Sequence, residues 1–495
     1  FPGAYPARYG RYAGAMIAGE TTPPEENRAR GEFGARVFDA HAFVEAPFDN
    51  GQATALAAGR YSYTGLLTSL IVPDYTVGYW DYQLRASHRV ADKDTLSLFV
   101  FGSHDELTYK GSPTFHIEYH RADLRYDHPI RDGHLRIAGT FSHDDTLTAL
   151  QTSTGAGASA ALNGPGGRIR AEIEEQVSPS ARVRAGADFG VKRFSVDNYA
   201  DTFHPPHSDV VGGAYADVVW RPTARVEAVP GFRFDGYQTR GETAWAPQPR
   251  LSTRVRLLPS VSWISALGMA HQEPSEEVFV PAKLPSPIGA ASRGDSYQFS
   301  EAVEVKLPSS LRVRVTAFAS RLVATQVSGE VRAEGLEFFL RRDFTRRLAG
   351  FVSYTLSRSD SVVGTQTTRS SWDRRHLLSA VVGYDLGLNW RVGARLFLES
   401  GRPYEALCQT PNCAPGPSAT LYSVKGDLPA FYRLDARLEK KWLFSGGRWL
   451  AGTLECFNVL DRAEPIFADY TPSQGLTIRR QSPIILPSIG IEGGF

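Results

Sequence analysis

The sequence predicts an all-β chain folded as a transmembrane antiparallel β-barrel of about 22 strands, with short periplasmic turns and long extracellular loops. Three observations support this prediction. Apolar and charged residues alternate with a period of two, the alternating segments are about ten residues long, and short links alternate with longer ones. A period of two indicates strands with two different faces, and the pattern of links is typical of outer-membrane barrels.

Composition limits the classes of protein that fit. The 495 residues include 54 Lys and Arg against 53 Asp and Glu, a net charge of +1, which does not suggest the concentrated basic surface of a nucleic-acid binder. Apolar residues make up 42% of the chain, too large a share for a disordered protein. No run of about 20 apolar residues is present, so we expect no membrane-spanning helix.

The links between the alternating segments define the strands. The first strand pair is expected at residues 31–38 and 41–48, and the last pair at 448–460 and 478–495. An even number of strands places both ends of the barrel on the same side of the membrane. Short links fall at residues 49–51, 91–94, 178–180, 307–310 and 445–447, and longer ones at 148–165, 197–208, 273–294, 361–369 and 402–428.

The alternation also predicts which side chains face the lumen. Because Arg or Lys facing lipid at the bilayer midplane costs about 2–4 kcal/mol, the charged positions should face an aqueous interior. The apolar positions of the same strands, among them Val392, Leu396, Leu434 and Leu438, should face lipid. For each charged residue, simple solvation of a wet wall remains the alternative to a functional role. The lumen-facing candidates are Arg312, Arg314, Arg391, Arg395, Arg433, Asp435, Arg437 and Glu439.

Two of the long links contain residues with other possible chemistry. Cys408 and Cys413 are a disulfide candidate because strand parity places their link on the oxidising outer side, and two free thiols are the alternative. His204 and His207 could ligate a metal, but the two prolines between them do not aim both rings at one point. We therefore treat them as weak candidates and expect no metal site and no cofactor.

Motifs of nucleophilic and nucleotide-dependent enzymes are absent from the sequence. There is no G-x-S-x-G, no P-loop and no G-x-G-x-x-G that opens a helix. We therefore expect that the chain is not an enzyme.

Several motifs resemble those of TonB-dependent receptors of the bacterial outer membrane. The first stretch resembles the end of a plug domain, and the last two together are the most specific pairing. The motifs are PARYGRYAGAMIAGET at residues 6–21, SYTLSR at 353–358, WDRRH at 372–376, SGRPY at 400–404, YRLDARLEK at 432–440 and FNVLDR at 457–462. The terminal Phe495, on an alternating last strand, resembles the signal that such barrels present to their assembly machinery.

The resemblance implies a domain organisation. Residues 1–30 would be the C-terminal remnant of a plug domain with its linker, and residues 31–495 the transmembrane barrel. Residues 1–20 should then lie against the charged inner wall or at the periplasmic mouth. Most of the plug and the energy-coupling segment have no counterpart in the sequence. The chain is then either the barrel portion of a longer receptor, or a barrel that another polypeptide fills.

The resemblance also implies a function and partners. The leading hypothesis is uptake of a scarce, bulky nutrient, such as an iron chelate, cobalamin, a sugar or a peptide, by a multi-pass protein of the bacterial outer membrane. The expected partners are outer-membrane lipid, a TonB-type coupling protein that would bind an N-terminal segment, and the barrel-assembly machinery, but no nucleic acid. The alternative is a structural or plugless barrel within a larger outer-membrane assembly or secretion complex, with a separate plug or other subunits as partners.

Overall fold

The computed structural model of the chain describes residues 5–22, 27–71, 74–91, 93–151, 157–198, 206–239, 241–272, 294–324, 329–343, 347–407, 423–471, 475–481 and 483–495. Nearly all of the regular structure in these residues is β-strand. One α-helix, α1 (Thr64–Ile71), follows the third strand. Among the described residues, no helix is both long and apolar enough to cross a bilayer.

The strands follow one another along the chain as antiparallel neighbours. They are β1 (Arg30–Arg36), β2 (Asp39–Phe48), β3 (Ala53–Ser62), β4 (Tyr75–Arg89), β5 (Thr95–Tyr109), β6 (Ser112–Ile130), β7 (Gly133–Gln151), β8 (Gly157–Ser178), β9 (Ala181–Asn198), β10 (His207–Thr223), β11 (Val226–Thr239), β12 (Glu242–Leu258), β13 (Val261–Gln272), β14 (Gly294–Leu307), β15 (Leu311–Ala324), β16 (Gly329–Arg342), β17 (Leu348–Val363), β18 (Gln366–Arg369), β19 (His376–Gly387), β20 (Trp390–Glu399), β21 (Pro403–Leu407), β22 (Ser423–Asp427), β23 (Phe431–Leu443), β24 (Trp449–Phe457), β25 (Pro465–Thr471), β26 (Gly475–Arg480) and β27 (Leu486–Gly494).

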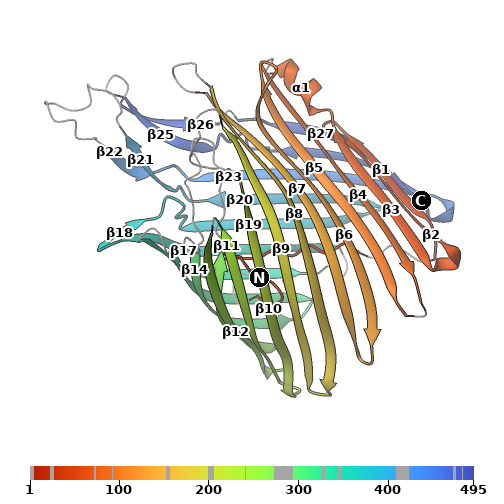
Figure 1. Ribbon diagram of the computed structural model, residues 1–495. Coiled ribbons are helices and arrows are strands. Elements are labelled where there is room, and N and C mark those ends of the chain that lie inside the picture. The colour runs from red at the N-terminus through yellow and green to blue at the C-terminus, as the bar shows by residue number, and fades with distance from the viewer. Residues whose placement is uncertain are drawn as a thin grey trace.

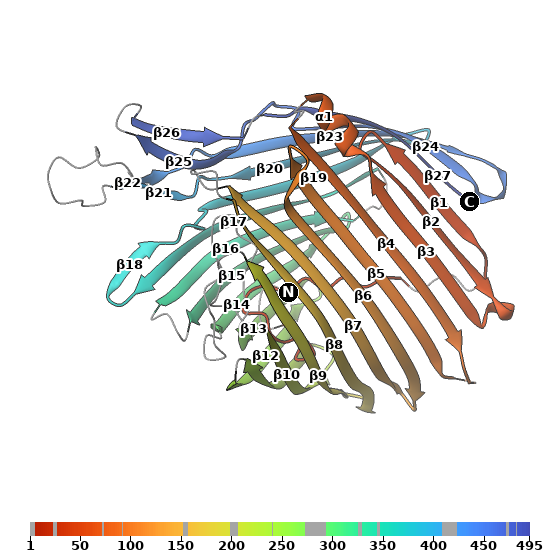
Figure 2. The ribbon, with the colours of Figure 1, turned by 45° about the horizontal axis from the view of Figure 1, so that its top comes forward.

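The sheet closes into a barrel of 22 strands, which confirms the predicted fold class. Closure comes from the pairing of the first strand with the last, with Glu32 opposite Gly494 and Arg36 opposite Gly490. The wall skips β18, which pairs only with β17, and the separate hairpins β21–β22 and β25–β26. Figure 2 shows these three additions projecting from one end of the ring.

The wall is uneven in height. Strand β8 has 22 residues, whereas β24 and β27 have nine each. A tilted strand needs only about 9–11 residues to cross a bilayer, so the tall strands are longer than a crossing requires. Figure 1 shows the difference between the long β6–β9 side and the shorter strands that close the ring.

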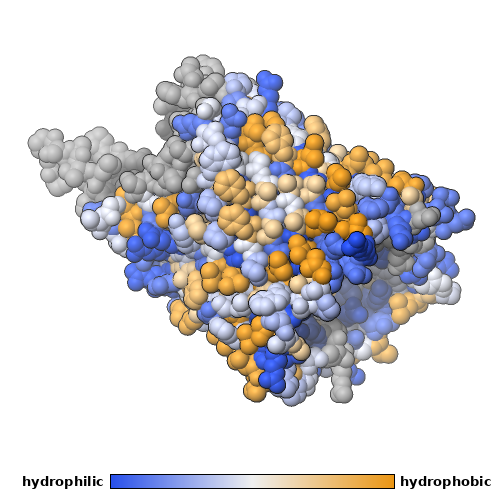
Figure 3. Space-filling view, turned by 60° about the horizontal axis from the view of Figure 1, so that its bottom comes forward, coloured by the Kyte–Doolittle hydropathy of each residue, from blue (hydrophilic) through white to orange (hydrophobic). Residues whose placement is uncertain are grey.

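The predicted alternation gives the wall one apolar face and one polar face. Along β11 the exposed fractions are 49% for Phe232, 1% for Arg233, 41% for Phe234 and 0% for Asp235. The aromatic side chains therefore project outward, and the ions are buried on the inner side. Figure 3 shows apolar side chains over much of the visible outside and a hollow with mainly hydrophilic side chains at its edge.

An N-terminal segment, residues 5–22, runs inside the ring of strands, as Figures 1 and 2 both show. It packs through a small apolar cluster in which Tyr5 and Met16 meet Ala270 of β13. Residues 5–20 lie against the barrel wall, as expected, and residues 1–4 of the same expectation lie outside the described residues. The contacts of the segment range from β4, where Arg85 reaches Thr21, to β14, where Gln298 reaches Ala13.

The structure corrects several boundaries. Most of the long link expected at residues 148–165 is strand, because the small residues at the start of β8 pair with the end of β7. The link at 361–369 is the β17–β18 hairpin. The last strand begins at Leu486 and not at residue 478, because residues 475–480 pair with β25 in a hairpin outside the wall.

Candidate functional site

The N-terminal segment covers one side of the inner wall, which we call the covered wall: the inner faces of β8, β9, β11, β12 and β14. Arg250 of β12 is its main anchor. The Nη1 atom of Arg250 donates to the carbonyl oxygens of Tyr5, Pro6 and Tyr9 at 3.0, 3.1 and 2.7 Å. Its guanidinium also lies 4.3 Å from the centre of the Tyr5 ring. One side chain therefore fixes a whole turn of the segment.

The Tyr5 hydroxyl is part of the same anchor and donates to the carbonyl oxygen of Tyr12. Burial raises the pKa of this phenol, and the nearby Arg250 cation opposes the shift. The neutral, hydrogen-bond-donating form of Tyr5 is thus the form that the folded segment favours.

A buried ion network joins the segment to the covered wall. Arg233 Nη2 contacts Asp188 at 2.8 Å and Asp235 at 2.7 Å, and Arg11 of the segment contacts the same two carboxylates at 2.5 and 3.1 Å. Gln248 donates to Asp235 at 2.5 Å. Two cations and two anions compensate each other in a space from which water is almost excluded.

Two glycines make room for this network. A Cβ at Gly10 would lie 2.1 Å from Arg233 Nε, and one at Gly213 would lie 2.0 Å from Asp235 Oδ1. Because both ions are held by several partners, neither can move aside cheaply. The segment can therefore approach Arg233 this closely only with a glycine at position 10.

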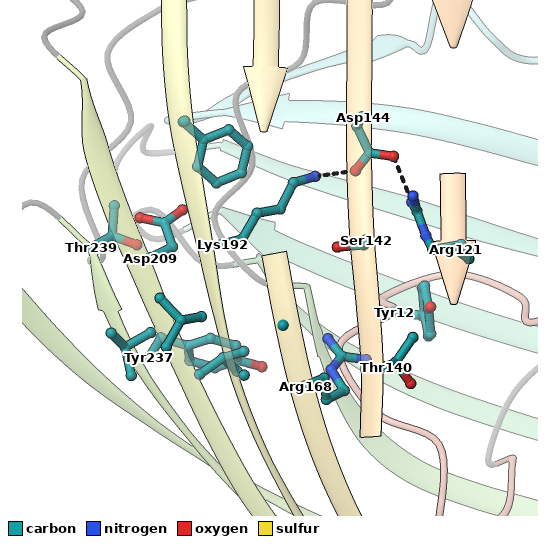
Figure 4. Close-up of a pocket in the computed structure, with 16 residues that line it drawn as sticks. Tyr12, Arg121, Thr140, Ser142, Asp144, Arg168, Lys192, Asp209, Tyr237 and Thr239 are labelled. Atoms are coloured by element: carbon teal, nitrogen blue, oxygen red, sulfur yellow. Dashed lines mark hydrogen bonds and ion pairs between the residues drawn. The ribbon is translucent and has the colours of Figure 1, made fainter. Parts of the chain in front are cut away.

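A cavity of about 360 Å³ opens beside the segment, on the inner wall of β6–β11. Figure 4 shows Arg121, Arg168 and Lys192 around it, together with Tyr12 of the segment. Strand β6 supplies Arg121, β7 supplies Asp144, β8 supplies Arg168 and β9 supplies Lys192. Alternate positions on neighbouring strands thus converge on one space.

The charges that line this cavity are not balanced. Asp144 holds both Arg121, at 2.5 Å, and Lys192, at 2.8 Å (Figure 4). Arg168 makes no ion pair or side-chain hydrogen bond with any residue that the structure describes, and its side chain is exposed. Asp209 is the other carboxylate in the lining. Three cations against two anions give the lining an excess positive charge, which an anionic group could neutralise.

On the opposite side of the ring lies what we call the open wall: the inner faces of β20, β23, β24, β27 and β1. Arg437 contacts Glu455, Glu439 at 2.9 Å and Glu492 at 3.8 Å, and Arg36 contacts Glu492 at 2.9 Å. These pairs resemble those of the covered wall, but their arginines are partly exposed.

The predicted lumen-facing residues fall mainly on this open wall. Arg433 contacts Asp435 at 3.0 Å. Arg391 lies opposite Glu439 and Arg395 opposite Asp435, so each pair shares a face. The last two candidates are on β15, where Arg314 contacts Glu304 at 2.5 Å and Arg312 is 4.0 Å from Asp343. A role for any of them in contacting solute stays a prediction.

The other candidates from the sequence have mixed outcomes. Cys408, Cys413 and His204 lie outside the described residues. His207 stacks on Phe194 and lies 3.6 Å from Asp209, and no group of three or more possible ligands in the described part of the chain could hold a metal. Phe495 exchanges backbone hydrogen bonds with Gly31 at the barrel seam, and its role as an assembly signal stays a prediction.

Sequence reasoning missed the two most organised places, the buried network and the cavity. A usable signal was present, since Arg168 and Arg170, like Arg233 and Asp235, are charged at alternate positions of one strand. The convergence of β6–β12 with residues 5–16 could not be inferred in this way, because those contacts cross long stretches of chain.

Comparison with known proteins gives a consistent result. A family model described as "TonB dependent receptor-like, beta-barrel" matches residues 25–459. No match is found among curated proteins.

Solved structures share the fold at low sequence identity. The siderophore receptor PirA from Acinetobacter baumannii has a TM-score of 0.75 and 13% identity, covering 100% of this chain and 84% of that one. The ferric yersiniabactin uptake receptor FyuA from Yersinia pestis has a TM-score of 0.71 and 10% identity, covering 96% and 81%. The copper transporter OprC has a TM-score of 0.68 and 11% identity, covering 94% and 80%.

Proposed function

The chain belongs to the TonB-dependent receptor-like β-barrel family, and from this premise we propose that it takes up a bulky anionic nutrient, such as a metal chelate, across the bacterial outer membrane. Members of the family are outer-membrane receptors and transporters, and not enzymes. A TonB-type coupling protein supplies the energy. The expected contacts with outer-membrane lipid and the barrel-assembly machinery belong to the same proposal.

We infer an anionic cargo from the lining of the cavity beside Tyr12. Its Arg168 has no ionic partner among the described residues, and Lys192 and Arg121 share the single carboxylate of Asp144. Guanidinium and ammonium groups bind carboxylates, phosphates and similar anions through charge-assisted hydrogen bonds. A neutral sugar would use these groups poorly. The similar structures include a siderophore receptor and a copper transporter, which supports a metal cargo.

The contacts of the N-terminal segment support the proposed domain organisation. Residues 1–30 are the end of a plug domain and its linker, and residues 31–495 are the barrel. Arg250, Gln298 and the Arg233 network support this assignment, because they bind backbone and side chains of the segment inside the ring. Tyr12 lies in the cavity wall, so displacement of the segment would alter the cavity as well.

Uptake by cells that lack their own receptors for the tested chelate tests this function. Cells producing the protein should accumulate radioactive iron from an anionic ferric chelate, and should stop when the inner-membrane proton gradient is dissipated. The variant Arg168→Gln should raise the chelate concentration that gives half-maximal uptake by about tenfold, because it removes one charged hydrogen-bond donor. Arg391→Gln, an exposed arginine of the open wall, is the matched control.

The outcomes separate the alternatives. Uptake that persists without the proton gradient would make a passive pore the better account. A complete lack of uptake, together with stable co-purification of other outer-membrane subunits, would favour the structural role. An equal effect of Arg168→Gln and Arg391→Gln would remove the cavity from the proposal.

A further inference from the structure

The outside of the barrel has an apolar groove that the uptake function does not use. It runs across β12–β16 with a volume of about 670 Å³. On the outer face it is lined by Leu251, Leu267, Met269, Tyr297, Phe299 and Ala319. The large apolar side chains come from β12, β13 and β14, on one side of the small Ala319 of β15. Its dimensions and lining therefore suit an acyl chain more than a polar ligand.

One end of this groove is charged. Arg321 and Arg332 lie opposite each other in register, and their side chains are 57% and 58% exposed. Both contact Glu330, which is only 10% exposed, so two guanidinium groups share one carboxylate. The other carboxylate of the groove, Glu334, lies opposite Arg358, and Arg358 is 2.6 Å from Asp360. The outward N–H groups of Arg321 and Arg332 are thus available at the surface.

The height of the two arginines agrees with the boundary of a bilayer. Arg321 lies ten residues beyond Leu311, the first residue of β15, and Arg332 lies ten residues before Arg342, the last residue of β16. Leu311 follows a connection of three residues after β14, and Arg342 precedes one of five residues before β17. Short connections mark the periplasmic side of such barrels. Because a strand crosses the bilayer in about 9–11 residues, the arginines lie at the outer interface and the groove extends below them into the hydrocarbon layer.

We propose that this groove binds one phosphorylated acyl lipid of the outer leaflet, with an acyl chain along Phe299 and Ala319 and a phosphate group on Arg321 and Arg332. The outer face of a membrane barrel is in contact with lipid, so a lipid is the molecule that has direct access to this groove. Arginine pairs bind phosphate through parallel, charge-assisted hydrogen bonds. The apolar lining lies below the charged rim, just as the acyl chains of such a lipid lie below its phosphate group.

Native mass spectrometry of the full chain in a neutral detergent tests the proposal. The two probes are dioleoyl phosphatidic acid and dioleoylglycerol, which have the same chains and differ in the phosphate. The protein should retain one phosphatidic acid with an affinity about tenfold higher than for dioleoylglycerol. Equal binding of the two lipids would overturn the assignment of a phosphate site.

Variants locate the site. The double variant Arg321→Gln and Arg332→Gln should lower the affinity for phosphatidic acid to that for dioleoylglycerol. Arg193→Gln, an exposed arginine on the same face of β9 as Phe189 and Val191, should not change it. Ala319→Phe should fill the groove and weaken both lipids. A preference for phosphatidic acid that survives in the double arginine variant would place the site elsewhere and overturn the proposal.

Discussion

The covered wall and the open wall contain the same short pattern, an arginine followed two residues later by an aspartate. On β11, Arg233 and Asp235 have side chains that are 1% and 0% exposed. On β23, Arg433 and Asp435 are 37% and 12% exposed. The first pair also meets Asp188 and Arg11, whereas Asp435 accepts a hydrogen bond from the backbone of Asn458.

The difference teaches that burial, and not the pattern, decides what such a pair contributes. An exposed pair contributes about 0–1 kcal/mol, because water competes for both ions. Loss of one partner from a buried pair costs about 3–5 kcal/mol, because the other charge is left buried without compensation. The N-terminal segment therefore buries part of a barrel wall that would otherwise be in contact with water, and makes it part of the structural core.

The largest expected effect is that of removing one arginine from each wall. Arg233→Ala should lower the free energy of unfolding by about 3–5 kcal/mol, since it leaves Arg11 as the one cation shared by the two buried carboxylates of Asp188 and Asp235. Arg433→Ala should lower it by less than about 1 kcal/mol. Denaturant titration in detergent, followed by tryptophan fluorescence, measures both. Similar values for the two variants would show that the covered wall is hydrated after all.

A smaller effect is expected from the glycines of the segment itself. Gly10→Ala should weaken docking of the segment by about 1–3 kcal/mol, because its Cβ would overlap Arg233. Gly14→Ala is the matched control, since nothing lies within 4 Å of the position that its new methyl group would take. Hydrogen exchange of residues 5–16, read by mass spectrometry, should rise in the first variant alone. Unchanged protection in Gly10→Ala would mean that the network rearranges freely.

The smallest effect concerns pH. Because the pKa of Tyr5 is raised by burial, its stabilising contribution is fully present below the ordinary tyrosine pKa of about 10 and is lost as pH rises through the raised value. Ultraviolet absorbance of wild type minus Tyr5→Phe should therefore show a titration with a midpoint above pH 10. Tyr61→Phe, which removes an exposed tyrosine, serves as reference. A midpoint at or below 10 would indicate that Tyr5 is in contact with water.

The sequence by itself determined the fold class and the two faces of the wall. Both are local properties: side chains alternate along each strand whatever the strand pairs with, as Phe232 and Arg233 illustrate. Turn chemistry is local too, and the expected short link at residues 49–51 is a tight turn in which Asn50 and Gly51 have positive φ angles.

Only the tertiary structure decided which charges are buried and where the cavity lies. Arg250 binds the carbonyl of Tyr5, which precedes it by 245 residues, and no period or motif in the sequence encodes that contact. The same holds for the strand-like start of β8, since small residues such as Gly157 and Ala158 become strand only through pairing with β7. Strand pairing, and the cover of the inner wall by the N-terminal segment, both depend on closure of the whole barrel. Local alternation therefore set the two faces of each strand, whereas the closed ring decided which inner residues form a site.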